Sequence, residues 1–143
     1  MIPYPSSGLK MLAGRVLSSV VPALGTKFAM SDTAMLAMLM AALAEEMESG
    51  VDSRLADIKT MGEIILAAQA AGIGVAELDS GATLQLDGEG AYTLTRVNEL
   101  HDALSRILIS IHSEVERSEE FSELNRNIWL YLEATSERHK LAL

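Results

Sequence analysis

Carboxylates gather at the end of a long apolar stretch and offer the first possible chemistry in the sequence. Residues 33–44 carry no charge, and Glu45, Glu46 and Glu48 follow directly. Glu45 and Glu48 share a helix face near a C-terminus, where the helix dipole disfavours negative charge. An arrangement that works against local electrostatics can mark a binding site. One hypothesis is therefore a carboxylate-lined pocket near Glu45 and Glu48 that binds a metal or a small ligand, as in an oxidoreductase or a carrier.

The histidines do not add to this pattern. Helical bundles with di-iron carboxylate sites combine inward Glu residues with two Glu-x-x-His pairs. The residues three positions before the histidines are not Glu but Asn98, Ile109 and Ser136. His101 and His112 are eleven residues apart, about 16 Å along one helix, which is too far for both to bind one metal ion. Because the chain also has no cysteine, we predict neither a metal site nor a cofactor.

A second motif has the spacing of a helix-turn-helix. Ala68, Gly72 and Leu78 would be its marker positions. The helix that would read DNA contains Glu77 and Asp79 and has no basic or amide side chain. Such a helix can neither contact phosphates nor donate to guanine. An acidic helix-turn-helix-like regulator is thus a second alternative, and nucleic acid is not expected as a partner.

The net charge of −9 is unevenly distributed along the 143 residues. The first 31 residues carry +3 and the remaining 112 carry −12. An acidic body repels phosphate backbones and anionic lipid, so we expect neither nucleic acid nor a membrane as a partner. The uncharged run at residues 33–44 is 12 residues long, whereas a membrane-spanning helix needs about 20. We expect a soluble protein, and the absence of cysteine favours the cytoplasm. The basic N-terminal segment is expected to form a packed helix or, alternatively, a targeting segment.

Apolar residues recur at helical spacing along most of the chain. With the capping residues that flank them, they predict five helices: Ser7–Val21, a second from Ser31 or Asp32 to Gly50, Asp52–Ala71, a fourth capped by Thr95 and lasting to about Val115, and a fifth from Glu119. The break between the last two is placed at Ser118, and the alternative is one long helix over residues 95–140.

Glycine-rich residues interrupt this helical pattern. Leu84 and Leu86 alternate with polar residues, as do Tyr92 and Leu94, around the sequence DGEG. This pattern indicates a small β-hairpin or irregular excursion near residues 73–94. The sequence therefore predicts an all-α fold, a compact and mostly antiparallel bundle of four to five helices with this excursion. The bundle is expected to form a single domain, residues 1–143.

The predicted second helix is apolar over most of its circumference. Its large residues form one stripe: Leu36, Leu39, Leu43 and Met47. Methionines, among them Met35 and Met38, cover another side, and their flexible thioethers suit adaptable binding surfaces. A helix apolar on two sides is buried inside a bundle or covered by a partner.

Trp129, the only tryptophan, lies just off the core stripe of the last helix. It either fills a seam at the core edge or faces a partner, and Trp is enriched in interface hot spots. We predict an interaction surface that includes Met35, Met38 and Trp129. The leading hypothesis is a non-enzymatic helical protein that acts through protein contacts, as a homodimer and possibly with another protein.

Overall fold

The computed structural model describes residues 4–74, 86, 88 and 90–140. The chain divides into two compact units, the first ending at Gly50 and the second comprising Val51–Lys140. Regular structure in the described residues is helical and includes no strand, so the all-α prediction is confirmed. The single domain expected over residues 1–143 stays a prediction.

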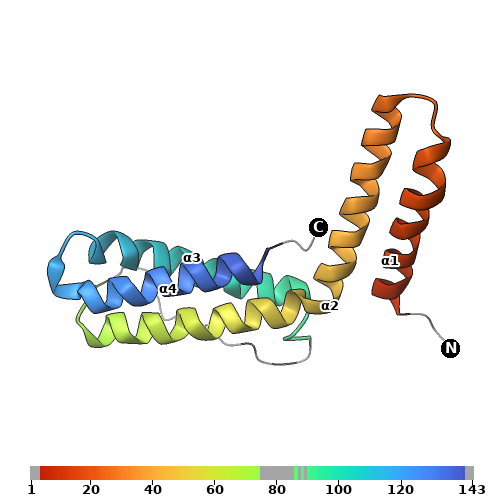
Figure 1. Cartoon of the computed structure of the whole chain (residues 1–143). Helices are drawn as coiled ribbons and strands as arrows, with labels where there is room; N and C mark the ends of the chain where they lie inside the picture. Colours follow the sequence, from red (N-terminus) through yellow and green to blue (C-terminus); the bar gives the residue numbers. More distant parts are fainter. Residues whose placement is uncertain (1–3, 75–85, 87, 89, 141–143) are drawn as a thin grey trace. The chain divides into compact units, whose positions relative to one another are not determined.

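The described residues form four α-helices (Figure 1). They are α1 (Pro5–Arg15), α2 (Lys27–Ala70), α3 (Leu94–Val115) and α4 (Ser122–Arg138). A π-helical turn, η1 (Val16–Val20), and a 3₁₀ turn, η2 (Val21–Ala23), continue α1, and a second 3₁₀ turn, η3 (Glu119–Phe121), precedes α4. The part of α2 up to Gly50 belongs to the first unit and the remainder to the second.

The second and third predicted helices are one helix. The interruption predicted at Gly50 and Asp52 was wrong, because α2 continues through both residues. A glycine inside a helix costs only about 1 kcal/mol relative to alanine, and long helical segments on both sides tolerate that cost. Gly50 is also buried, which keeps its backbone away from competing water.

The predicted break near residue 118 is confirmed. α3 ends at Val115, and the Ser118 side-chain oxygen accepts a hydrogen bond from the backbone N–H of Glu120 at 3.3 Å. This bond satisfies a backbone donor that would otherwise be unpaired at the start of η3. The alternative of one helix over residues 95–140 was therefore wrong.

The predicted excursion at residues 73–94 lies mostly outside the described residues. Its described end is not a strand, since Tyr92 lies in a turn and Leu94 is the first residue of α3. Thr93 caps this helix, because its Oγ1 accepts from the backbone N–H three residues further on at 3.5 Å. The cap predicted at Thr95 was two residues late.

The second unit is a three-helix bundle (Figure 1), and its buried apolar side chains form one continuous core. Its largest fully buried side chains include Met61 of α2, Ile111 of α3 and Ile128 of α4. The apolar residues that recur at helical spacing along α3 are buried: Val97, Leu100, Leu104, Ile107, Ile111 and Val115. Large apolar side chains from all three helices therefore stabilise this unit.

Contacts at one end of this core fix the helix directions. Asp57 and Met61 of α2 lie beside His101 and Ser105 of α3, respectively, so these two helices run parallel. Thr135, near the end of α4, also contacts Asp57. α4 therefore runs antiparallel to both neighbours, as Figure 1 shows for the second unit.

The first unit pairs α1 with the first part of α2 through small side chains. The residues that are buried in these two segments include Ser6, Ala13, Ala37 and Ala44. The stripe predicted to lie in a core is instead exposed: Leu36, Leu39, Leu43 and Met47. Small residues let the two helices approach closely, but the pairing covers little of the large apolar surface.

We expect Ile111→Ala to lower the free energy of unfolding by about 2–5 kcal/mol, because it leaves a cavity at a fully buried position. The matched control is Ile109→Ala two residues earlier on α3, where the side chain is mostly exposed; its effect should stay within about 0.5 kcal/mol. Urea denaturation followed by circular dichroism measures both. Equal effects of the two substitutions would contradict this placement of the core.

Candidate functional site around Asp57

One carboxylate is completely enclosed by the second unit. Asp57 of α2 is 0% exposed and is the one fully buried acidic or basic residue among those described. Removing a carboxylate from water costs several kcal/mol unless charges and hydrogen bonds compensate it. The neighbours of Asp57 must therefore supply that compensation.

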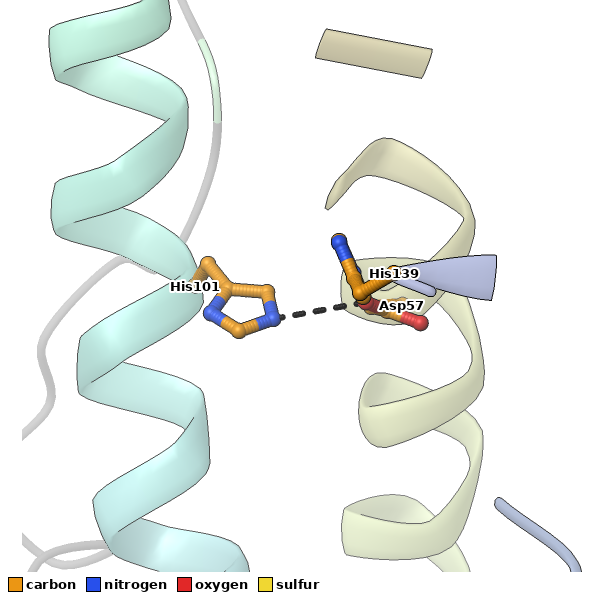
Figure 2. A group of neighbouring side chains, drawn as sticks. All are labelled: Asp57, His101 and His139. Atoms are coloured by element: carbon orange, nitrogen blue, oxygen red, sulfur yellow. Dashed lines mark hydrogen bonds and ion pairs between the residues drawn. The ribbon is translucent and has the colours of Figure 1, made fainter. Parts of the chain in front are cut away.

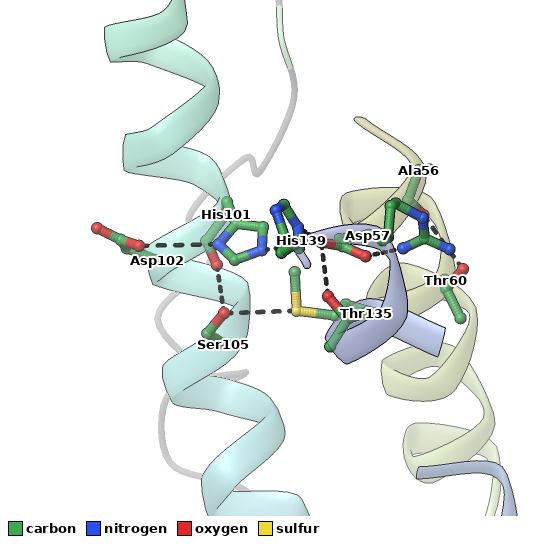
Figure 3. Close-up of polar contacts among 10 residues, drawn as sticks. Ala56, Asp57, Thr60, His101, Asp102, Ser105, Thr135 and His139 are labelled. Carbon is green, nitrogen blue, oxygen red and sulfur yellow. Dashed lines mark hydrogen bonds and ion pairs between the residues drawn. The ribbon is translucent and has the colours of Figure 1, made fainter. Parts of the chain in front are cut away.

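The last turn of α4 supplies most of it (Figure 3). Thr135 donates from Oγ1 to Asp57 Oδ2 at 2.8 Å, and Arg138 donates from Nη1 to Oδ1. His139 Nε2 is hydrogen-bonded to Oδ2 at 2.5 Å. The spacing of these residues by three and four positions places them on one helix face. Their side chains therefore converge on a single carboxylate.

The third helix contributes a histidine that faces the same group (Figure 2). His101 Nε2 lies 3.5 Å from Asp57 Oδ2. This nitrogen is shielded from solvent and has no hydrogen-bond partner in the described part of the chain. The other ring nitrogen, Nδ1, lies 3.8 Å from the exposed carboxylate of Asp102. The His101 and His139 rings meet edge-on, with their centroids 6.4 Å apart.

Burial alone raises the pKa of Asp57, because it disfavours the charged form. The hydrogen bonds from His139 and Thr135 and the positive charge of Arg138 act in the opposite direction and outweigh it. The pKa of Asp57 therefore lies below its ordinary value, and the carboxyl is ionised at neutral pH. Burial, followed by the charge of Asp57, raises the pKa of Tyr131 on α4.

A pocket of about 340 Å³ adjoins this cluster. Its lining comes from all three helices: Arg54, Asn98, His101, Asp102 and His139. The side-chain oxygen of Asn98 is buried and has no hydrogen-bond partner among the described residues. Two of the residues that line this pocket, Asn98 and His101, thus each carry a shielded polar atom with no hydrogen-bond partner among the described residues.

Asp57, His101 and His139 each offer one potential metal ligand, and the three atoms lie within 4.8 Å of one another. Within the described residues, this is the one group of three histidine or acidic side chains close enough to bind a common ion. A carboxylate and two imidazoles are typical ligands of zinc and other divalent transition metals. The same groups can also take up and release protons.

The prediction of no metal site considered a different pair of histidines, His101 and His112, and it stays a prediction. His112 lies against Trp129, with ring centroids 5.6 Å apart, and its Nε2 is 3.4 Å from a carboxylate oxygen of Glu116. His101 instead lies beside His139, from which it is separated by 38 positions in the chain. Periodicity on one helix could not reveal this pairing.

Asp57 itself was not among the functional residues predicted from the sequence. The signal available was an acidic residue four positions before Met61, on the helix face that the core buries. The helix predicted over Asp52–Ala71 includes Asp57, but no role was assigned to this residue. An acid at a core position would have indicated a partner elsewhere in the chain.

The residues of the predicted interaction surface are exposed but do not share a unit. Met35 and Met38 lie in the first unit, on α2, and Trp129 lies in the second, on α4. Trp129 lines a pocket of about 470 Å³ whose wall is mainly apolar and comes from α4: Arg126, Trp129, Leu130, Leu132 and Glu133.

The two carboxylates of the predicted pocket join the helices of the first unit. Lys10 Nζ lies 2.8 Å from Glu45 Oε2, and Ser6 Oγ donates to Glu48 Oε2 at 2.8 Å. The hydrogen bond to Glu45 and its negative charge raise the pKa of Lys10. Glu45 and Glu48 therefore have a structural role in pairing α1 with α2.

The glycine of the helix-turn-helix pattern ends a helix. Gly72 has φ of +77°, its N–H donates to the Gln69 carbonyl at 3.0 Å, and the Ile73 N–H donates to the Ala68 carbonyl at 3.1 Å. These two bonds form a Schellman motif, which accounts for the spacing of Ala68 and Gly72. Leu78 and the predicted DNA-reading helix lie outside the described residues.

No protein-family model matches this chain, and neither a curated protein nor a solved structure does so. The function is therefore inferred from the geometry of the Asp57 cluster and from the surface of the first unit.

We expect Asp57→Asn to lower the free energy of unfolding by about 1.5–3 kcal/mol at pH 7, because it removes the charge that Arg138 and His139 contact. The pKa of Asp57 is lowered by folding, so its stabilisation is complete above the ordinary value of about 3.9 and is lost as pH falls through the native value. The difference between the two proteins should therefore shrink in acid.

Urea denaturation at a series of pH values between neutral and acid measures this difference. The matched control is Asp102→Asn, which removes an exposed carboxylate on α3 and should change stability by less than about 0.5 kcal/mol. A difference between wild type and Asp57→Asn that stays constant down to the lowest pH would contradict the ionised, paired state of Asp57.

Proposed function

We propose that this chain is a non-enzymatic helical protein that acts through protein contacts, and that its first unit binds a second copy of the chain. The observation that supports this most directly is the exposed apolar face of α2. Leu36, Leu39, Leu43 and Met47 recur at steps of three and four residues and are 53–58% exposed. Stripes of this kind are covered by another helix in stable proteins.

The direction of this face explains why α1 does not cover it. At 3.6 residues per turn, Leu39 lies about 160° around the helix from Ala37 and about 140° from Ala44. Ala37 and Ala44 are fully buried, whereas Leu39 is exposed. Leu39 thus points away from the side that pairs with α1, and so does Met35 of the predicted interaction surface, four residues earlier. The rest of the stripe lies on one flank of the helix, about 60–120° around from the buried alanines.

A lipid bilayer is the other environment that would cover an apolar helix. By length and composition α2 could cross a membrane, and little of its apolar stretch is buried within the chain. Its uncharged run, however, covers only residues 33–44, about 18 Å at 1.5 Å per residue, against a hydrocarbon core of about 30 Å. Asp32 and Glu45 would enter the hydrocarbon, so we favour a protein partner in the cytoplasm.

A second copy of the chain fits this face in length. The 24 residues of α2 in the first unit extend about 36 Å, and one helix with its side chains is about 10 Å across. The α2 face therefore measures roughly 360 Å² per copy, less than the about 800 Å² per partner of a standard interface, so we expect a weak, concentration-dependent dimer. Two such helix pairs related by a two-fold axis would form a four-helix bundle.

We expect Met35→Glu combined with Leu39→Glu to raise the dimer dissociation constant at least about 100-fold, because both charges would be buried in the interface. The matched control is Leu66→Glu, at an exposed position of α2 in the second unit; it should leave the dissociation constant unchanged. Sedimentation equilibrium over a concentration series measures all three proteins.

A wild-type chain that stays monomeric at every concentration would overturn the proposal. The same is true of a dimer that both variants weaken equally. Co-sedimentation of a monomeric chain with phosphatidylcholine vesicles would instead identify lipid as the partner of the α2 face.

A further inference from the structure

We propose that Asp57, His101 and His139 bind one divalent transition-metal ion of the zinc class, with one coordination position open to the adjoining pocket. This site is separate from the apolar face of the first unit, and all three ligands come from one chain. Its existence therefore does not depend on whether the chain self-associates.

The ligand atoms are close to the separations that a metal requires. Zinc binds nitrogen and oxygen at about 2.0–2.1 Å, so neighbouring ligands of a tetrahedral ion lie about 3.3 Å apart. Asp57 Oδ2 lies 3.5 Å from His101 Nε2 and 2.5 Å from His139 Nε2. The second distance is that of a hydrogen bond, and a metal between the two groups would lengthen it by about 1 Å.

The position of His139 makes this adjustment easy. His139 is the residue that caps the C-terminus of α4, and its side chain is one-third exposed. A side chain at the end of a helix can shift without disturbing core packing. Asp57 and His101 lie within helices and would change little, so two of the three ligands are already in place.

The unpartnered atoms at the cluster point to a ligand. His101 Nε2 is shielded from solvent and makes no hydrogen bond to the described residues, although it faces the Asp57 carboxylate. A buried polar atom without a partner is destabilising, and a metal–nitrogen bond would offset that cost. One turn earlier on α3, Asn98 lines the same pocket, and its side-chain oxygen, which has no hydrogen-bond partner among the described residues, could accept from a water bound to the ion.

The remaining contacts of Asp57 orient it as a one-oxygen ligand. Arg138 occupies Oδ1, and Thr135 donates to Oδ2 (Figure 3). Hydrogen bonds of this kind fix the orientation of metal-binding carboxylates. The positive charge of Arg138 opposes a dication and lowers the affinity, but it also keeps the carboxylate ionised. Oδ2 is therefore the oxygen that binds the metal.

The ligand set selects among metals. Two imidazoles and one carboxylate suit Zn²⁺, Co²⁺, Ni²⁺ and Fe²⁺, whereas Mg²⁺ and Ca²⁺ prefer oxygen alone and Cu⁺ prefers sulfur. Three protein ligands with a fourth position open to a pocket are typical of zinc sites that bind an exchangeable water. The exposed side chain of Asp102 also lines this pocket, so the open position has access to solvent.

Isothermal titration of the full, untagged chain with ZnCl₂ tests the site, and MgCl₂ serves as the comparison ion. We expect one Zn²⁺ per chain and no heat from Mg²⁺. His101→Ala should weaken Zn²⁺ binding at least about 100-fold, because it removes a ligand rather than a group supporting one. The matched control, His112→Ala on the same helix, should change the affinity less than about two-fold.

Thermal unfolding separates loss of the site from loss of the fold. Zn²⁺ should raise the Tm of the wild type and of His112→Ala but not that of His101→Ala. If circular dichroism shows that His101→Ala does not fold, His139→Ala removes a ligand at the end of α4 and should lose binding equally. Less than half a Zn²⁺ per wild-type chain, or equal weakening by His101→Ala and His112→Ala, would overturn the proposal.

Discussion

A carboxylate with no exposed surface must be surrounded by donors, and in this chain that requirement determines how three helices meet. Asp57 of α2 needs the last turn of α4 within hydrogen-bond distance, and it lies against His101 of α3. A shift of α4 by one residue would rotate its donors by about 100° and leave the carboxylate unpaired. Apolar contacts tolerate rearrangement of their side chains, but a buried charge does not. The polar cluster therefore specifies a register that the apolar core stabilises.

The two units differ in which apolar side chains they bury. The second unit buries large side chains from three helices and compensates its one buried charge. The first unit buries small ones, such as Ala37 and Ala44, and leaves large apolar side chains on its surface. The second unit gains its stability from its own core, whereas the first unit leaves apolar surface that a partner could cover. This contrast is the reason why we propose self-association for the first unit and metal binding for the second.

Local sequence patterns correctly predicted those features of the fold that depend only on residues close together in the chain. The helical spacing of apolar residues predicted α3 and α4, and the break between them was placed correctly at Ser118. Gly50 and Asp52 led to the wrong prediction of a helix break, because a long helix continues through a single residue of low helix propensity. The stripe from Leu36 to Met47 was recognised as apolar, but periodicity does not reveal what covers a stripe. The pairing of Asp57 with His139 joins residues 82 positions apart, so no local pattern indicated it.

The attachment of the final turn of α4 to Asp57 changes how this helix opens. A C-terminal turn ordinarily frays first, because its last carbonyls have no partner within the helix. Here fraying would strip a buried carboxylate of Thr135 and Arg138, so the turn opens only at a large cost. Slow amide exchange would then extend to the very end of α4 and follow that of the core. The backbone of this last turn therefore behaves as part of the interior, and its opening is coupled to unfolding of the whole bundle, whereas the partly exposed His139 side chain beyond it keeps room to shift.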